Sequence, residues 1–179
     1  VEADMAAEQA AAPSSGEDLA GAETAAIPVS PPPPRTAGQF GWPVAGKVIA
    51  RFGPAPSGTH NDGINIAAPL GTSVGAAEDG VVAYAGNELR GFGNLLLVRH
   101  QGGWMTAYAH NGELLVKRGD RVRRGQVIAR VGRTGNVTSP QLHFEVRKGT
   151  DAVDPLKYLG APPGSVSRAE YRGGPPGPG

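Results

Sequence analysis

The side chains best suited to chemistry in this sequence are its four histidines, His60, His100, His110 and His143. His60 lies in a loop that begins at Pro54, whereas the other three end or occupy segments rich in β-branched and aromatic residues. Imidazole is a common metal ligand and transfers protons near neutral pH, so several histidines brought together could build a metal or acid–base centre. A lone histidine is more often a polar residue on a sheet surface, so the neighbouring residues must decide.

Four short stretches, three of them next to a histidine, follow one another in an order that suggests a single site. They are Asn61–Pro69, Ala77–Val82, Tyr108–His110 and Gln141–Val146. Their sequences and spacing resemble the motifs of the lysostaphin/LytM-type metallopeptidases, zinc endopeptidases that cut peptidoglycan cross-bridges, and Asp154-Pro155 closes the domain as in that family. The resemblance covers roughly Gly41 to Leu159. It implies a mostly β fold, a LytM-type antiparallel sheet domain.

An active member of this family holds zinc with three side chains. Two come from a His-x-Gly-x-Asp motif, at its first and fifth positions, and the third is the second histidine of a later His-x-His. This leaves the fourth zinc position open to water, whose pKa the metal lowers to about 7. Aligned on Gly63, this sequence has Asn61 and Asn65 at the first and fifth positions of the motif. Of the three ligand positions, only that of His143 keeps the family residue. The resemblance therefore implies no zinc and no other cofactor.

Two further histidines of the family handle protons and the developing oxyanion. His110, in Tyr108–His110, keeps one of them, whereas Gln141 replaces the first histidine of His-x-His. Three of the five site residues are thus replaced, and we expect a catalytically inactive homologue rather than an enzyme.

One alternative retains the enzyme. His60 lies one residue before the expected ligand position and Asp62 is the only acidic residue nearby, so a shifted loop could recruit both. The domain would then be an active zinc endopeptidase that cuts peptidoglycan cross-links. A one-residue slip, however, turns a strand side chain to the opposite face, and Asn65 would still replace the anionic ligand. We therefore expect His60 to be a solvated loop residue.

The resemblance also carries a functional expectation. Zinc-less relatives, the NlpD- and DipM-like proteins of Gram-negative bacteria, activate peptidoglycan amidases or other wall hydrolases during cell division. We therefore expect a periplasmic monomer, with any signal peptide upstream of Val1, that binds a hydrolase such as an N-acetylmuramoyl-alanine amidase. The expected partner-binding groove is lined by Asn61, Asn65, His110, Gln141 and His143. An alternative is a peptidoglycan-binding module without a protein partner; we expect no nucleic acid and no membrane span.

Short segments of alternating character, separated by turn residues, predict the strands that would position these residues. They are about Lys47–Arg51, Gly63–Ala67, Val81–Ala85, Leu95–His100, Trp104–His110, Val127–Val131 and Gln141–Arg147. Gly102-Gly103 predicts a hairpin turn between two of them. No segment has a convincing helical period.

The segment from Val116 to Ile128 predicts a short, twisted strand pair of the kind found in lipoyl- and biotinyl-carrier domains. A carrier domain presents a modifiable lysine at a hairpin tip, usually beside a methionine. The only methionines here, Met5 and Met105, have no lysine next to them, so a carrier is disfavoured. The same segment forms a possible basic docking patch for an acidic protein or for the carboxylates of the cell wall, or merely a solvated face. The patch contains Lys117, Arg118, Arg121, Arg123 and Arg124.

Composition separates the folded part from its ends. Residues 1–40 carry six acidic residues and one basic residue, together with a Pro31–Pro34 run, and predict a disordered Ala/Pro-rich linker. Residues 41–160 carry nine acidic and fourteen basic residues and contain the domain, while 161–179 predict a disordered Gly/Pro-rich tail. The chain has no cysteine, which excludes disulfides and thiolate metal sites. The basic domain suits an anionic surface or an acidic partner.

Overall fold

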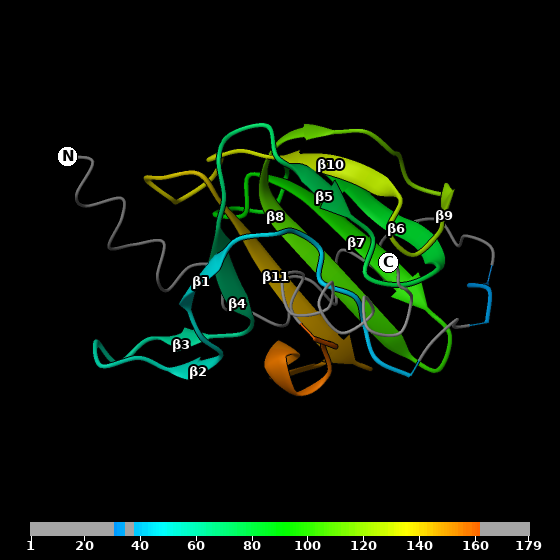
Figure 1. Cartoon of the computed structure of the whole chain (residues 1–179), viewed down its shortest axis with the longest axis horizontal. Coiled ribbons are helices and arrows are strands. Elements are labelled where there is room, and N and C mark those ends of the chain that lie inside the picture. Colours follow the sequence, from blue (N-terminus) through cyan, green and yellow to red (C-terminus); the bar gives the residue numbers. More distant parts are fainter. Residues whose placement is uncertain (1–30, 35–37, 162–179) are drawn as a thin grey trace, which may run out of the picture.

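A computed structural model describes residues 31–34 and 38–161 of the chain (Figure 1). The tails predicted for 1–40 and 161–179 lie almost wholly outside these residues. Within the described part, no helix is long and apolar enough to cross a membrane.

The fold is mostly antiparallel β, as the sequence predicted. A ten-stranded sheet has the central order β1-β4-β11-β8-β7-β6-β9; β10 joins it through β5 and β8, and β12 pairs with β11. The strands are β1 (Lys47–Ala50), β2 (Gly53–Pro54), β3 (His60–Asn61), β4 (Ile64–Ala67), β5 (Ser73–Gly75), β6 (Gly80–Gly86), β7 (Asn94–His100), β8 (Trp104–Leu114), β9 (Arg121–Val122), β10 (Val127–Val131), β11 (Gln141–Lys148) and β12 (Asp151–Val153). One 3-10 helix, η2 (Pro155–Lys157), follows them, and β2 and β3 form a separate two-stranded arm (Figure 1).

All seven predicted strands are present, with ends that agree within one residue except that β8 continues to Leu114. The predicted turn at Gly102-Gly103 joins β7 to β8, and both glycines have a positive φ, of 89° and 82°. The strands that the sequence did not predict, β2, β3, β5 and β12, have two or three residues each. A strand this short contains too few residues to show an alternation.

The strand pair predicted between Val116 and Ile128 was wrong. Strand β9 pairs with β6, whereas β10 pairs with β5 and β8, so the two strands of the segment belong to different parts of the sheet. The segment turns twice, at Gly119 and Gly125, each with a positive φ. Its Gly-rich pattern therefore marks two turns that return to strands distant in sequence.

The centre of the sheet is buried on both faces, which fixes the strands that carry the site. On β7, Leu96 and Val98 belong to the larger core cluster, while Leu95 and Leu97 belong to a second cluster on the opposite side. The same alternation holds on β8, and every residue of β11 except Lys148 is buried. Consequently His110 and His143 are held by the two strands with the most buried residues, seven each.

The packed unit includes one residue more than the expected start at Gly41. Phe40 is buried and forms a parallel bridge with Leu159. Its amide donates to the Tyr158 carbonyl, and the Gly160 amide donates to its carbonyl. The two ends of the domain are therefore bound to each other.

Candidate functional site

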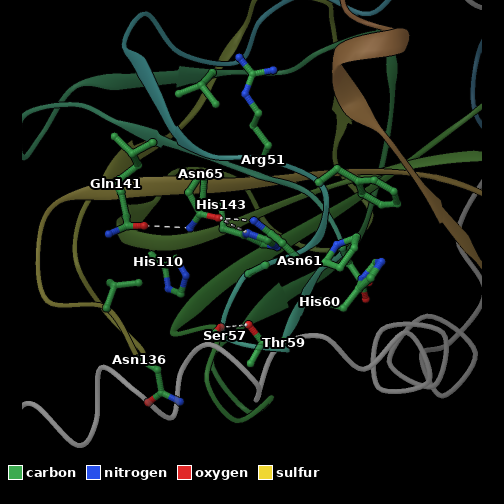
Figure 2. A pocket seen from close by; sticks show the side chains of 18 of the residues that line it. Arg51, Ser57, Thr59, His60, Asn61, Asn65, His110, Asn136, Gln141 and His143 are labelled. Atoms are coloured by element: carbon green, nitrogen blue, oxygen red, sulfur yellow. Dashed lines mark hydrogen bonds and ion pairs between the residues drawn. The ribbon is translucent and has the colours of Figure 1, made fainter.

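A groove with a volume of about 670 Å³ opens beside β4 and β11 (Figure 2). One wall is formed by β1 and the arm, and the other by the loop after β10. The floor is formed by Asn65, His110, Gln141 and His143. All five residues expected at the site, Asn61 included, line this groove.

Strand pairing places these residues side by side. In the register of β4 with β11, Asn65 lies opposite His143 and Ala67 opposite Gln141. On the other side of β11, His143 lies opposite Ala109, next to His110. Packing explains why the first motif has a glycine, Gly63: a Cβ there would collide with the backbone carbonyl of Phe144.

The three residues that replace family site residues, two at ligand positions and one at a catalytic position, bond to one another. They form a row of neutral amides, which we call the amide row: Asn61, Asn65 and Gln141. Asn61 Nδ2 donates to Asn65 Oδ1 over 3.1 Å, and Asn65 Nδ2 donates to Gln141 Oε1 over 2.8 Å (Figure 2). Nδ1 of His143 lies 3.2 Å from Asn65 Oδ1. Strands β4 and β11 are thus joined by hydrogen bonds where the family places a metal.

His110 bonds to the backbone rather than to the amide row. Its Nδ1 lies 2.8 Å from the carbonyl oxygen of Thr134, which can only accept a hydrogen bond. The loops around Gly93 and Thr134 pack tightly against each other, and the carbonyl lies at the Nδ1 edge of the ring. Burial lowers the pKa of His110 to about 3, with a smaller contribution from His143. His110 is therefore neutral, with its proton on Nδ1.

His110 also has a φ of 69°, which is unusual for a residue other than glycine. Asparagine tolerates this region well, so His110→Asn is a conservative way to remove the imidazole.

We expect the wild-type domain to lose about 2 kcal/mol of stability between about pH 6.5 and pH 4.5 through His110 alone. In this range the unfolded chain binds a proton at His110, while the folded chain does not, so stability falls as the pH falls. Urea unfolding at several pH values should show that the free energy of unfolding of His110→Asn falls less steeply with decreasing pH than that of the wild type. The variant His60→Asn leaves His110 in place and should keep the steep fall. Equal slopes for all three proteins would contradict the assignment.

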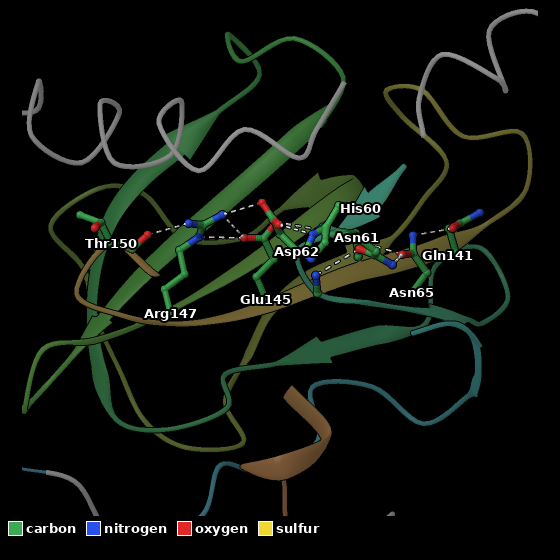
Figure 3. A network of polar contacts seen from close by, with 10 residues as sticks. His60, Asn61, Asp62, Asn65, Gln141, Glu145, Arg147 and Thr150 are labelled. Atoms are coloured by element: carbon green, nitrogen blue, oxygen red, sulfur yellow. Dashed lines mark hydrogen bonds and ion pairs between the residues drawn. The ribbon is translucent and has the colours of Figure 1, made fainter. Parts of the chain in front are cut away.

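A second buried network, behind the floor of the groove, was missed by the sequence reasoning. Nε2 of His143 lies 2.8 Å from Glu145 Oε2, and Arg147 Nε donates to Glu145 Oε1 over 2.8 Å (Figure 3). Arg147 also reaches Asp62 Oδ2 at 3.4 Å and the Thr150 carbonyl at 3.0 Å. We call Glu145 and Arg147 the charged row, and His143 bonds to the Glu145 carboxylate. Their period of two along β11 is a signal that could have predicted them.

The position of Asp62 tests the alternative in which it joins His60 in a metal site. Asp62 Oδ1 lies 3.1 Å from His60 Nδ1, while its other oxygen contacts Arg147. Burial raises the pKa of Asp62, as does Glu145, whereas Arg147 and His60 oppose the rise. His60 lies on β3 rather than in a loop, with half of its side chain exposed.

The residues present do not fit the zinc of the family. The former ligand positions offer one imidazole and two neutral amides, and both ring nitrogens of His143 already face protein oxygens. In residues 31–34 and 38–161, no three His, Asp or Glu side chains form a group that could hold a metal ion. The side chains at these positions form hydrogen bonds instead of metal bonds.

The basic docking patch is less free than the sequence suggested. Arg124 donates to the carbonyl of Gln39 and lies 3.7 Å from the buried Glu78, so it connects parts of the fold. Lys117 forms an ion pair with Asp120 at 3.2 Å. Arg121 and Arg123 remain exposed and Arg118 is half-buried.

Comparisons with known proteins agree with this geometry. The model of peptidase family M23 matches residues 59–155. The chain is 46% identical over 146 residues to the cell division protein DipM of Caulobacter vibrioides, covering 81% of this chain and 24% of DipM. It is 48% identical over 118 residues to the murein hydrolase activator NlpD of Escherichia coli, covering 66% of this chain and 30% of NlpD. The chain therefore spans less than a third of each of these relatives.

Solved structures agree as well. A zinc-containing peptidase from Vibrio cholerae superposes with a TM-score of 0.61 at 34% identity, covering 70% of this chain and 41% of that one. The catalytic domain of lysostaphin from Staphylococcus simulans superposes with a TM-score of 0.59 at 31% identity, covering 63% and 91% respectively.

Proposed function

Since the chain belongs to peptidase family M23, we propose that it is a catalytically inactive member that binds a peptidoglycan hydrolase and raises its activity. The observation that carries this proposal is the amide row, which occupies two ligand positions and one catalytic position inside a groove that is still open. A zinc hydrolase needs charged or imidazole ligands and a metal-bound water. The amide row provides neither, but leaves a surface on which another molecule can bind.

The names of the relatives support an activator. NlpD is named a murein hydrolase activator and DipM a cell division protein. We propose that the partner is an N-acetylmuramoyl-alanine amidase, that binding occurs in the periplasm of a Gram-negative cell, and that the domain acts as a monomer. Fold alone does not establish such a role, so the proposal depends on the site.

The deciding experiment measures release of dye from labelled sacculi by a purified amidase, with and without this chain. We expect release to rise when the chain is added, and no release from the chain alone. Release by the chain alone that requires zinc would identify an active endopeptidase. Binding to sacculi without stimulation of any amidase would identify a peptidoglycan-binding module.

Two surfaces could contact the amidase, and we favour the groove over the basic patch. Thr138 is an exposed residue of the groove wall, so Thr138→Trp should fill the groove without disturbing the amide row. We expect this variant to lower stimulation roughly tenfold, with little salt dependence. The double variant Arg121→Glu and Arg123→Glu, which spares the structural Arg124, should change stimulation less than about threefold. If the double variant instead lowered stimulation strongly and in a salt-dependent way, while Thr138→Trp changed it little, the contact would lie on the basic patch.

A further inference from the structure

The polar side chains of the groove divide into those already bonded and those available to a ligand. The amide row and His143 bond to one another, Ser57 bonds to Thr59, and His60 bonds to Asp62. Four lining residues keep unused side-chain hydrogen-bonding groups within the described part of the chain: Arg51, His110, Asn136 and Thr138. Binding by a ligand therefore depends on these residues more than on the former metal positions.

Arg51 is the most distinctive of the four. It follows β1, is exposed, and has no hydrogen bond or ion pair with any described residue. The one carboxylate that lines the groove, Asp62, is mostly buried and is bound by His60 and Arg147, so it does not neutralise Arg51. The groove thus presents an unpaired cation above a neutral floor. An occupant with a carboxylate would complement it.

The walls beside Arg51 are apolar. Ile49 lies two residues earlier and also lines the groove, and its side chain is 48% exposed although it is large and hydrophobic. Val48, Pro54 and Val137 also line the groove. In Figure 2, Arg51 and Asn136 lie on opposite sides of the amide row. An occupant can therefore contact apolar and polar groups on both walls.

From this arrangement we infer that the groove binds a segment of the partner hydrolase in which an acidic side chain lies beside apolar ones. Arg51 binds the carboxylate, Ile49 and Val137 contact the apolar residues, and Asn136 bonds to polar groups of the segment. His110, with its proton on Nδ1, offers Nε2 as an acceptor for an N–H or O–H of the segment. This inference rests on the proposed function and makes Arg51 a specificity-determining residue.

The lining favours a protein segment over a glycan strand. Sugars stack on exposed aromatic faces and need many hydrogen-bonding partners. The groove has one phenyl ring, Phe52, which packs edge-on against His60 with ring centroids 5.4 Å apart, and most of its amides are already engaged. Apolar walls with one exposed cation suit an amphipathic peptide better.

The test uses the purified amidase that the parent chain stimulates, and measures its affinity for Arg51→Glu, Arg51→Lys and Arg123→Glu. We expect Arg51→Glu to weaken binding at least tenfold and Arg51→Lys to weaken it less, since lysine keeps the charge but loses the fork of donors. Arg123→Glu makes the same charge change on the basic patch and should stay within about threefold of the parent. Because Arg51 is exposed, all variants should keep the parental melting temperature.

Four outcomes separate the possibilities. Recovery of binding to Arg51→Glu by an acidic-to-lysine substitution in the amidase would establish the pairing. Equal amidase affinity for Arg51→Glu and the parent would overturn the inference while leaving the activator function in place. Loss of sacculus co-sedimentation with unchanged amidase affinity would assign Arg51 to the stem-peptide carboxylates instead. If the parent stimulates no amidase, the proposed function itself fails, and the inference with it.

Discussion

Replacing Arg147 with methionine should lower the free energy of unfolding by about 3–5 kcal/mol, because it leaves buried carboxylates without their cation. Arg147 is 2% exposed and Glu145 is fully buried, with two nitrogens of the guanidinium 2.8 Å from one carboxylate oxygen. Asp62 loses the same partner. Methionine fills much of the volume of the side chain, so the loss reports mainly on charge.

Urea or thermal unfolding measures this loss, which should lower the melting temperature by about 10 °C or more for a domain of this size. The loss should shrink as the pH falls, since Asp62, whose pKa is raised by burial, can then take up a proton. Lys117→Met provides the control: it removes the cation of an exposed pair and should change stability by less than about 1 kcal/mol. A loss of similar size in both variants would show that the charged row contributes little.

The second prediction with a large expected effect concerns zinc binding by a variant of the site. The double variant Asn61→His and Asn65→Asp should bind about one zinc per chain, whereas the parent should bind none. Nδ1 of His143 already lies 3.2 Å from the Asn65 side chain, which itself bonds to Asn61, so the three positions face a common point. An imidazole and a carboxylate there would complete a three-ligand site. With zinc at about a thousand times its dissociation constant, the variant should gain about 4 kcal/mol of stability.

Metal analysis after dialysis and unfolding with and without zinc check this expectation. Adding His143→Ala to the double variant should abolish zinc binding. Peptidase activity should remain absent, because Gln141 still stands where the family has a histidine. About one zinc in the parent chain, lost in His143→Ala, would overturn the claim that the site is inactive.

The strands that position the site could be predicted because each shows the alternation of a half-buried or buried strand. Strand β10 was predicted to the residue, from Val127 to Val131. The motifs also predicted which residues meet in the groove, because antiparallel pairing of β4 with β11 sets Asn65 opposite His143. In these strands, the local sequence pattern and the tertiary structure favour the same conformation.

Other features depend on contacts between segments far apart in sequence. Residues Val116 to Ile128 have the turns of a hairpin, but their strands pair with β6, β5 and β8. The partner of His110 is a backbone carbonyl at Thr134, and no residue type at that position could have indicated it. The sequence shows Glu145 and Arg147 but not that they are buried, because their burial follows from the central place of β11 in the sheet.

The amide row has a consequence for how this domain responds to its surroundings. In a zinc enzyme the crosslink between strands β4 and β11 would come and go with the metal supply, and a chelator could remove it. Here the crosslink is made of side chains of the chain itself, and amides neither titrate nor exchange. The shape of the groove is therefore set when the chain folds and persists when zinc is scarce or removed by EDTA.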